Sequence, residues 1–171
     1  MRAWLAAALT LVGATATPVA ALDPRDFMRP CRRHDLIGVW RVLRFGFAQG
    51  AAVDRTDAAY LPHQRYVFHS NATMAYVTQD VPFTPEDQRE LPKLPPTATW
   101  ALESDGRLVR QRDGMPVVEK ADCKIVLEPV TDPRGSQPRA QRGDILLTDE
   151  TSDRRPVTRR LLRKIRGLGG D

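Results

Sequence analysis

The rest of this chain is built around the stretch Leu36-Ile37-Gly38-Val39-Trp40-Arg41-Val42-Leu43. It is rich in residues that favour strands, and this character continues through Phe47, so we predict a β-strand here. Gly38 and Gly46 lie inside the strand, where glycine often marks a bend or a bulge. We therefore expect the bent first strand of a small antiparallel barrel, with Trp40 as the floor of its core.

Short alternating segments separated by turn signals follow along the chain. Tyr66 and Phe68 alternate onto one face of a strand, and Met74 and Tyr76 do the same on the next strand. Asp105-Gly106 is a strong signal for a further hairpin. We expect strands at 36–47, 64–69, 72–78, 97–103, 107–112, 117–128, 144–148 and 156–165. The predicted fold class is all-β, a single antiparallel up-and-down barrel of eight or nine strands.

The last of these elements, 156–165, fits two patterns. As a strand, it places Val157, Arg159, Leu161, Arg163 and Ile165 on one face. As a helix, it has an apolar stripe formed by leucine and isoleucine side chains, with Arg and Lys on the opposite side. Closing a barrel requires a last strand that pairs with the first one, so we predict a strand.

The segment from Asp80 to Pro96 breaks the alternation because it holds five prolines. Thr84 and Pro85 are suited to the cap and the first position of a short helix. Long ordered loops are often functional. We expect this segment to be a lid over one mouth of the barrel, and it is the first candidate for contact with a ligand.

The N-terminus has the pattern of a secretory signal peptide. Met1-Arg2 is a basic start, an apolar run too short to span a bilayer follows, and Val19-Ala20-Ala21 provides small residues for cleavage. The predicted organisation is a signal peptide at 1–21, an irregular lead-in at 22–35, a barrel domain at 36–166 and a tail at 167–171. The pattern predicts an exported protein, periplasmic or secreted.

The chain contains two cysteines, Cys31 and Cys123. An even number in an oxidising compartment suggests a disulfide, and the alternative is two unpaired thiols. The bond would close a loop of about 90 residues, worth roughly 4 kcal/mol in the chain-entropy model. No Cys-x-x-Cys redox motif is present.

The formal net charge of the chain is +5, and basic residues gather near its C-terminus. The stretch 154–166 holds seven basic residues and no acidic one. In an exported protein this excludes nucleic acid as the expected partner and favours an anionic membrane or envelope surface, if the stretch binds anything. The alternative is a solvated strand face and tail.

Gly38-Val39-Trp40 resembles the Gly-x-Trp signature in the first strand of lipocalins. Strand order, Asp-Gly hairpins and an arginine-rich last strand extend the resemblance over about 36–165. The Thr-Asp motif followed by Tyr is missing, so the chain is most similar to the looser bacterial lipocalin-like domains. The resemblance implies that Trp40 lies at the closed end of an eight-stranded barrel. It also implies that an arginine packs across the indole, with Arg159, Arg160 and Arg163 as candidates.

Catalytic and metal-binding motifs do not emerge from the pattern. The spacing of His34, His63 and His69 does not converge two metal ligands, and no serine lies in Gly-x-Ser-x-Gly. Glu119 lies at an alternating strand position, where it either points into the barrel or lies on its rim. We predict a protein that is not an enzyme and has no metal and no cofactor.

Two functions follow from this reading. The first is a monomer that binds a small apolar or amphipathic molecule, as the resemblance implies. The second is an envelope structural or interaction protein with a filled barrel, which contacts an anionic partner through its basic last strand. The residues expected to line the interior are Tyr66, Phe68, Met74, Tyr76, Trp100 and Leu102. The interior volume discriminates between the two functions, because a cavity of several hundred Å³ favours the binding protein.

Overall fold

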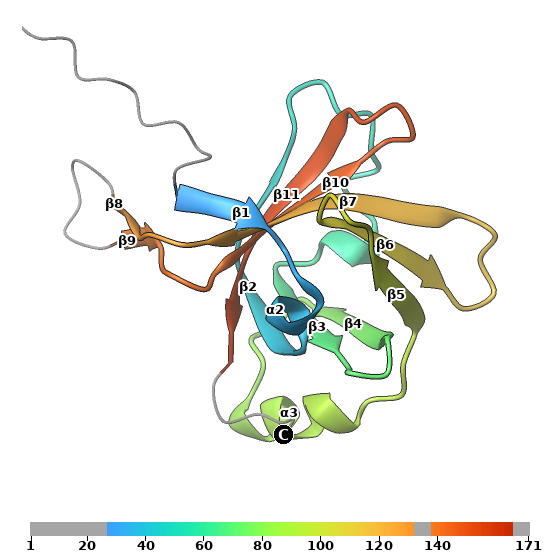
Figure 1. The fold of residues 1–171 in the computed structure, drawn as a ribbon. Helices are drawn as coiled ribbons and strands as arrows, with labels where there is room; N and C mark the ends of the chain where they lie inside the picture. Colours follow the sequence, from blue (N-terminus) through green and yellow to red (C-terminus); the bar gives the residue numbers. More distant parts are fainter. Residues whose placement is uncertain (1–26, 132–137, 166–171) are drawn as a thin grey trace, which may run out of the picture.

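A computed structural model describes residues 27–131 and 138–165, and its fold is all-β, as predicted. Eight strands form a closed antiparallel barrel, to which one short strand is added (Figure 1). The barrel strands are β2 (Gly38–Phe47), β3 (His63–Phe68), β4 (Thr73–Gln79), β5 (Ala98–Leu102), β6 (Arg107–Arg112), β7 (Val118–Val126), β10 (Ile145–Glu150) and β11 (Pro156–Lys164). The predicted signal peptide and the C-terminal tail lie outside the described residues.

Four short helices and three further strands complete the described chain. The helices are α2 (Arg33–Leu36), η1 (Ala58–Tyr60), α3 (Pro85–Glu90) and η2 (Leu91–Lys93). The strands are β1 (Met28–Pro30), which pairs with β7, and β8 (Val130–Thr131) and β9 (Pro138–Ala140), which pair with each other. The lead-in expected to be irregular therefore contains a strand and a helical turn. None of the helices among the described residues is long and apolar enough to cross a membrane.

The barrel closes where β2 pairs with β11, so the last element is a strand rather than a helix. Trp40 lies opposite Lys164 and Val42 opposite Leu162. Leu161 then pairs with Arg44, which leaves Leu43 as the extra residue of a β-bulge. Beyond the bulge, register pairs Phe45 with Arg160 and Phe47 with Thr158. These register partners share the inner face of the barrel.

The wall of the barrel is continuous at one end and divided at the other. β2 pairs with β3 only from Gly38 to Arg41, and β4 pairs with β5 only through Thr73 and Met74. Both ladders stop on the side away from Trp40. The aromatic residue Tyr60 of η1 occupies the first of these gaps, where it stacks on Phe45 with ring centroids 5.6 Å apart. We call the continuous end the closed end and the divided end the open end.

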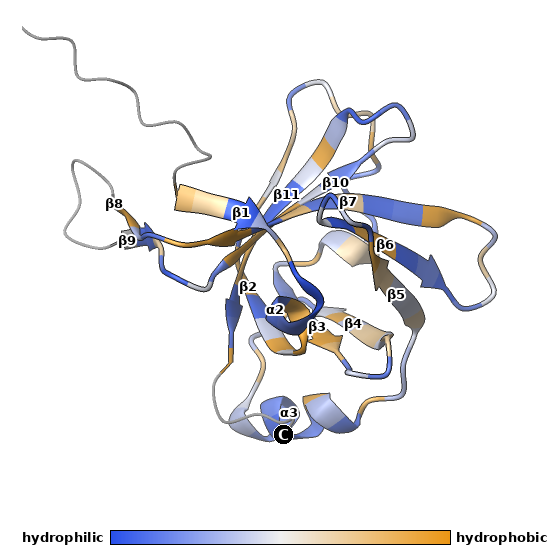
Figure 2. Ribbon diagram, in the orientation of Figure 1, coloured by the Kyte–Doolittle hydropathy of each residue, from blue (hydrophilic) through white to orange (hydrophobic). Residues whose placement is uncertain are grey.

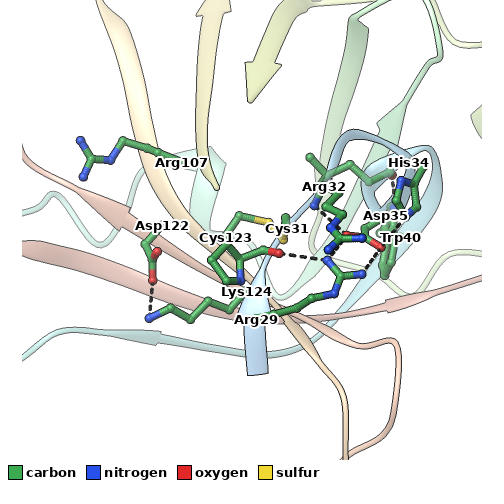
Figure 3. The surroundings of a disulfide bond; sticks show 12 residues. Arg29, Cys31, Arg32, His34, Asp35, Trp40, Arg107, Asp122, Cys123 and Lys124 are labelled. Atoms are coloured by element: carbon green, nitrogen blue, oxygen red, sulfur yellow. Dashed lines mark hydrogen bonds and ion pairs between the residues drawn. A yellow bond between two sulfur atoms is a disulfide. The ribbon is translucent and has the colours of Figure 1, made fainter. Parts of the chain in front are cut away.

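The closed end is held by the N-terminal segment. Cys31 and Cys123 form the predicted disulfide, and β1 extends the sheet beside β7 (Figures 1 and 3). Arg29 makes a two-pronged ion pair with Asp35, with N–O distances of 2.7 and 2.9 Å. This pair fixes α2 against the barrel, which seals the end of the core.

Trp40 is the buried floor of the core, as predicted, but the residue that lies over it differs. Its indole nitrogen donates to the carbonyl oxygen of Leu36 in α2 at 2.6 Å. The cation over its ring is Lys164, whose Nζ is 5.8 Å from the ring centroid. The prediction of an arginine here is wrong, because alternation along β11 places Lys164, and not Arg163, on the inner face opposite Trp40.

The structure explains why the first residue of the Gly-x-Trp sequence, Gly38, is a glycine. Its φ is +127°, a conformation that residues with a side chain rarely adopt. A Cβ atom built there would lie 2.6 Å from Cε of Lys164. Gly38 therefore lets the lysine side chain cross the start of β2 to reach the Trp40 ring.

The sequence suggested that the proline-rich segment 80–96 is a lid over the mouth of the barrel, and this prediction is wrong. Its helix α3 lies beside β3 and β4, outside the barrel (Figure 1). Phe83 and Leu91 are buried in a second apolar cluster, on the outer face of the sheet. That cluster includes Val67 and Ala75, which alternate outward from the core residues. Outward apolar side chains on β3 and β4 need cover, and this segment provides it.

Candidate functional site

The six residues expected to line the interior all face the core, but most of them fill it. Tyr66, Phe68, Met74 and Trp100 are buried in the main apolar cluster, while Tyr76 and Leu102 are partly buried and packed against it. Phe68 meets Trp100 edge to face with ring centroids 5.5 Å apart. The closed half of the barrel is therefore a packed core.

A cavity of about 970 Å³ occupies the open end of the barrel. Three of the six predicted residues, Tyr66, Met74 and Tyr76, line it. Phe68, Trp100 and Leu102 are not among its lining residues. The remaining walls come from η1, from Ala98 of β5, from the hairpin between β6 and β7, and from β10 and β11. Its volume lies at the upper end of the range for small-molecule sites.

On β6, β10 and β11, the inward-facing residues change from apolar to polar toward this cavity. Leu108 is followed on the same face of β6 by Arg110, and Leu147 is followed on β10 by Asp149. On β11, Arg160 comes next to the buried Leu162 on the inner face. Figure 2 shows that β6 is mainly hydrophilic, while hydrophobic residues are prominent on β3 near α2.

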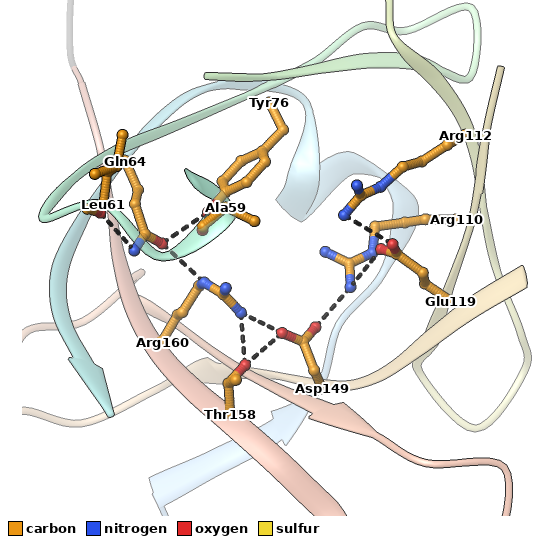
Figure 4. Close-up of polar contacts among 10 residues, drawn as sticks. All are labelled: Ala59, Leu61, Gln64, Tyr76, Arg110, Arg112, Glu119, Asp149, Thr158 and Arg160. Carbon is orange, nitrogen blue, oxygen red and sulfur yellow. Dashed lines mark hydrogen bonds and ion pairs between the residues drawn. The ribbon is translucent and has the colours of Figure 1, made fainter. Parts of the chain in front are cut away.

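Asp149 lies at the centre of a charged network on the inner wall. Arg110 from β6 and Arg160 from β11 approach its carboxylate from opposite sides (Figure 4). Arg110 Nη2 is 2.6 Å from Oδ1, and Arg160 Nη1 donates to Oδ2. Thr158 donates its hydroxyl hydrogen to the same Oδ2 and accepts from Arg160 Nη1 at 2.6 Å. This single carboxylate joins side chains of β6, β10 and β11 across the interior of the barrel.

A second set of hydrogen bonds attaches η1 to the network. Arg160 Nε donates to Oε1 of Gln64 at 2.9 Å, and the Gln64 amide donates to the carbonyl oxygen of Leu61 at 3.0 Å. The Tyr76 hydroxyl donates to the carbonyl oxygen of Ala59 at 2.7 Å. Buried Gln64 thus links the interior charges to the connection between β2 and β3.

Electrostatics keep the members of the network in their charged forms. Burial would raise the pKa of Asp149, but the charges of Arg110 and Arg160 and the hydrogen bond from Thr158 outweigh it, so the pKa is lowered. Burial would lower the pKa of Arg110, but the Asp149 charge outweighs it, and the pKa is raised. Two guanidinium groups therefore share one carboxylate in the interior.

The three tyrosines beside the network stay neutral phenols. Burial raises the pKa of Tyr60, Tyr66 and Tyr76 above the ordinary value of a phenol. They supply apolar rings and hydroxyl groups to the cavity without adding negative charge. The rings of Phe45, Tyr60 and Tyr76 also lie within 6.0 Å of the Arg160 guanidinium.

The rim of the cavity is both charged and apolar. Glu119 is on the rim, where it pairs with Arg112 at 2.8 Å and with Arg110 at 3.4 Å. Three exposed large hydrophobic residues of the described chain lie on or beside the β6–β7 turn: Met115 is 52% exposed, Val117 62% and Val118 44%. We call Met115, Val117 and Val118 the apolar lip.

The basic stretch 154–166 does not form one surface. Arg160 points into the barrel, and Arg163 is neutralised by Asp144 at 2.7 Å. Lys164 lies over Trp40, while Arg159 is exposed on the outer face. Arg166 lies outside the described residues. Alternation along β11 therefore separates charges that are adjacent in sequence.

Arg110, Asp149 and Gln64 are site residues that the sequence reasoning missed. Their signal was strand parity, because each lies two residues from a core residue on the same face: Leu108, Leu147 and Tyr66. Following the inner face to the end of each strand would have identified them.

Comparison with known proteins adds no closer relationship. A scan against models of protein families and searches of curated proteins and solved structures found no match to this chain. Within 27–131 and 138–165, no group of three or more His, Cys, Asp or Glu side chains is placed to hold a metal ion. The fold itself, a closed eight-stranded antiparallel barrel, is consistent with a lipocalin-like fold.

Proposed function

We propose that this chain is an exported lipocalin-like protein that binds a small amphipathic molecule in the cavity at the open end of its barrel. The observation that carries the proposal is the cavity of about 970 Å³, which joins aromatic walls to a charged network. A ligand with one polar and one apolar part matches both kinds of wall. Small-molecule sites combine these features, with a few polar groups that orient the ligand.

Support for a lipocalin-like protein comes from the closed end. Gly38 and Trp40 lie in the first strand, that strand pairs with the last one, and a cation from the last strand lies over the indole. Support for export comes from the Cys31–Cys123 disulfide, which is compatible with an oxidising compartment. The N-terminal pattern at 1–21 points the same way.

The alternative of a filled barrel with a basic contact surface has less support. It requires a solid interior, whereas a cavity lies at the open end. It also requires a continuous basic face on the last strand, whereas Arg160 is in the interior and Arg163 is paired with Asp144.

The test is a titration with N-phenyl-1-naphthylamine, a neutral fluorescent amphiphile, on wild type and two matched variants. Ala98 lines the cavity, and Ala101 is exposed on the other face of the same strand. We expect Ala98→Phe to weaken probe binding at least about tenfold, because the ring occupies the cavity, and Ala101→Phe to leave binding unchanged.

Circular dichroism and thermal unfolding check that both variants fold. If Ala98→Phe does not fold, Val118→Trp narrows the mouth from an exposed position and replaces it. A folded Ala98→Phe or Val118→Trp that binds the probe like wild type contradicts the proposal. Native mass spectrometry of protein isolated from its own host then identifies the natural ligand.

A further inference from the structure

The charged network specifies the ligand more closely, on the condition that the proposed function holds. We infer that the ligand is an amphiphile with a single carboxylate, which enters the cavity head first and is bound by Arg110 and Arg160. Its apolar part then lies along the tyrosine wall and reaches the apolar lip at the mouth. The sequence suggested an apolar interior, whereas the buried residues Arg110 and Arg160 make part of the cavity wall charged.

The first argument is the charge of the interior. Arg110 is 7% exposed and Arg160 3% exposed, and both depend on Asp149 as their buried carboxylate. The neighbouring tyrosines are neutral, and Glu119 reaches Arg110 only at 3.4 Å from the partly exposed rim, where it is shared with Arg112, so the two buried guanidinium groups have one close carboxylate between them. An uncompensated charge away from water is costly, and one monoanion would neutralise it. A dianion would replace the excess positive charge by an excess negative one.

The second argument is the supply of hydrogen-bond donors. A guanidinium has five N–H groups, and the contacts of Arg110 with Asp149 and Glu119 all use Nη2. In the part of the chain that the structure describes, its buried Nε has no hydrogen-bond partner. Buried donors are almost always paired. Nη1 of Arg110 makes none of these contacts, so a carboxylate in the cavity that Arg110 lines can accept a hydrogen bond from it, in the planar geometry that suits a guanidinium.

The third argument fixes the orientation of the ligand. The charged network is buried, whereas Val117 and Val118 are exposed at the mouth and also line the cavity. Tyr60 and Tyr76 line the same cavity from η1 and β4. An amphiphile that entered tail first would bury its apolar part against Arg110 and Arg160 and would leave the lip uncovered.

The experiment compares four ten-carbon probes that differ only in their heads. Decanoate, decan-1-ol, decyl phosphate and decyltrimethylammonium are each used below their micelle concentration, and displacement of N-phenyl-1-naphthylamine is measured. We expect decanoate to bind at least about tenfold more tightly than decan-1-ol, since hydrogen bonds to charged groups differ from neutral ones by about that factor. Decyl phosphate is expected to bind more weakly than decanoate, and the cation most weakly.

The variant Arg110→Met tests the residue, because it leaves Asp149 paired with Arg160. Arg159→Met is the matched control, since it removes the same charge from an exposed position on the outer face. We expect Arg110→Met to abolish the preference for decanoate and to leave the affinity for decan-1-ol within about twofold. Arg159→Met should keep the wild-type order of affinities. If Arg110→Met does not fold, Arg110→Lys, which keeps the charge but not the guanidinium geometry, is expected to show a reduced preference.

The outcomes separate this inference from the function on which it rests. If none of the four probes displaces the naphthylamine, or the naphthylamine itself does not bind, the proposed function fails. If decan-1-ol binds as well as decanoate, the cavity binds amphiphiles but the carboxylate inference is wrong. Tighter binding of decyl phosphate than of decanoate also overturns it, and so does an unchanged preference in Arg110→Met.

Discussion

The two ends of the barrel use the same strands and the same alternation of side chains for opposite purposes. At the closed end, inward residues such as Trp40 and Leu108 fill the space and exclude water. At the open end, inward residues such as Arg110 and Asp149 surround a cavity and keep their charges. The difference shows that a strand pattern fixes which side chains face inward, whereas their position along the barrel axis determines what they do there.

Their energetics differ as well. Burial of apolar surface stabilises the closed end, and the disulfide adds to it. At the open end, Arg110, Arg160 and Asp149 have left water, and their mutual attraction must offset that cost. We therefore expect substitutions at the closed end to change stability alone. Substitutions at the open end should change stability and ligand binding together.

The largest effect should come from removing the disulfide. Cys31 and Cys123 are 92 residues apart, so the double change to Ala restores a large loop entropy to the unfolded chain. We expect the free energy of unfolding to fall by about 4–5 kcal/mol, measured by urea denaturation. Wild type in reductant is the control and should behave alike. A loss of less than about 1 kcal/mol would mean that β1 and α2 hold the closed end without the bond.

Asp149→Asn should have the next largest effect, because it leaves Arg110 and Arg160 without their carboxylate. Breaking a buried ion pair costs about 3–5 kcal/mol, and the cavity beside Asp149 favours the lower end of that range. Asp153→Asn, on the exposed β10–β11 turn, is the matched control and should be close to neutral. Equal stability of the two variants would show that the network contributes nothing to the fold.

The pH dependence of stability gives a second measure of the same group. The pKa of Asp149 is lower in the folded than in the unfolded chain, so its contribution is complete above the unfolded pKa of about 3.9. It is lost as the pH falls through the folded pKa. We expect wild type to lose stability below about pH 4 more steeply than Asp149→Asn does. Some slope should remain in the variant, because the pKa of Asp35 is also lowered.

Enlarging one alanine at each end tests the packing difference directly. Ala121 is fully buried in the packed core, whereas Ala98 borders the cavity. Ala121→Leu should cost about 1–3 kcal/mol, since a packed core resists added methylene groups. Ala98→Leu should remain within about 0.5 kcal/mol of wild type in thermal or urea unfolding. Similar costs at both positions would contradict the contrast between a packed end and a hollow end.

The smallest effect should come from the cation over Trp40. Lys164→Met removes its charge but keeps a long apolar side chain, and we expect a loss of about 0.5–1 kcal/mol in urea unfolding. Lys164→Arg should match or exceed wild type, because a guanidinium also stacks on an indole. A larger loss in Lys164→Arg than in Lys164→Met would show that the narrow space over Gly38 requires the lysine.

The sequence allowed the barrel to be predicted because its evidence is local. Alternating residues such as Tyr66 and Phe68, and turns such as Asp105-Gly106, reveal strands within a few positions. Closure by β2 and β11 followed from the need to satisfy both edges of a sheet. The disulfide between Cys31 and Cys123 could be predicted because the chain has two cysteines and its N-terminal pattern predicts export to an oxidising compartment.

The candidate site was harder to predict because it depends on the position of residues along the barrel axis. Arg160 looked like one member of a basic stretch, and only its place opposite Phe45 shows that it faces inward. The segment 80–96 was predicted to be a lid, but its residue Phe83 packs against apolar side chains on the outer face of the sheet. Such contacts join residues distant in the sequence, so neither composition nor local periodicity reveals them.

The β-bulge at Leu43 determines which residue of β2 faces Arg160 inside the barrel. Because one residue is added to β2, Phe45 rather than Arg44 faces Arg160 across the ladder. Without it, uninterrupted pairing would place the guanidinium of Arg44 opposite that of Arg160, and like charges facing each other across strands repel. The bulge thus decides whether the neighbour of Arg160 is an aromatic ring or a second cation. If Leu43 instead entered regular pairing, Arg44 would bring a second positive charge to face Arg160 inside the barrel.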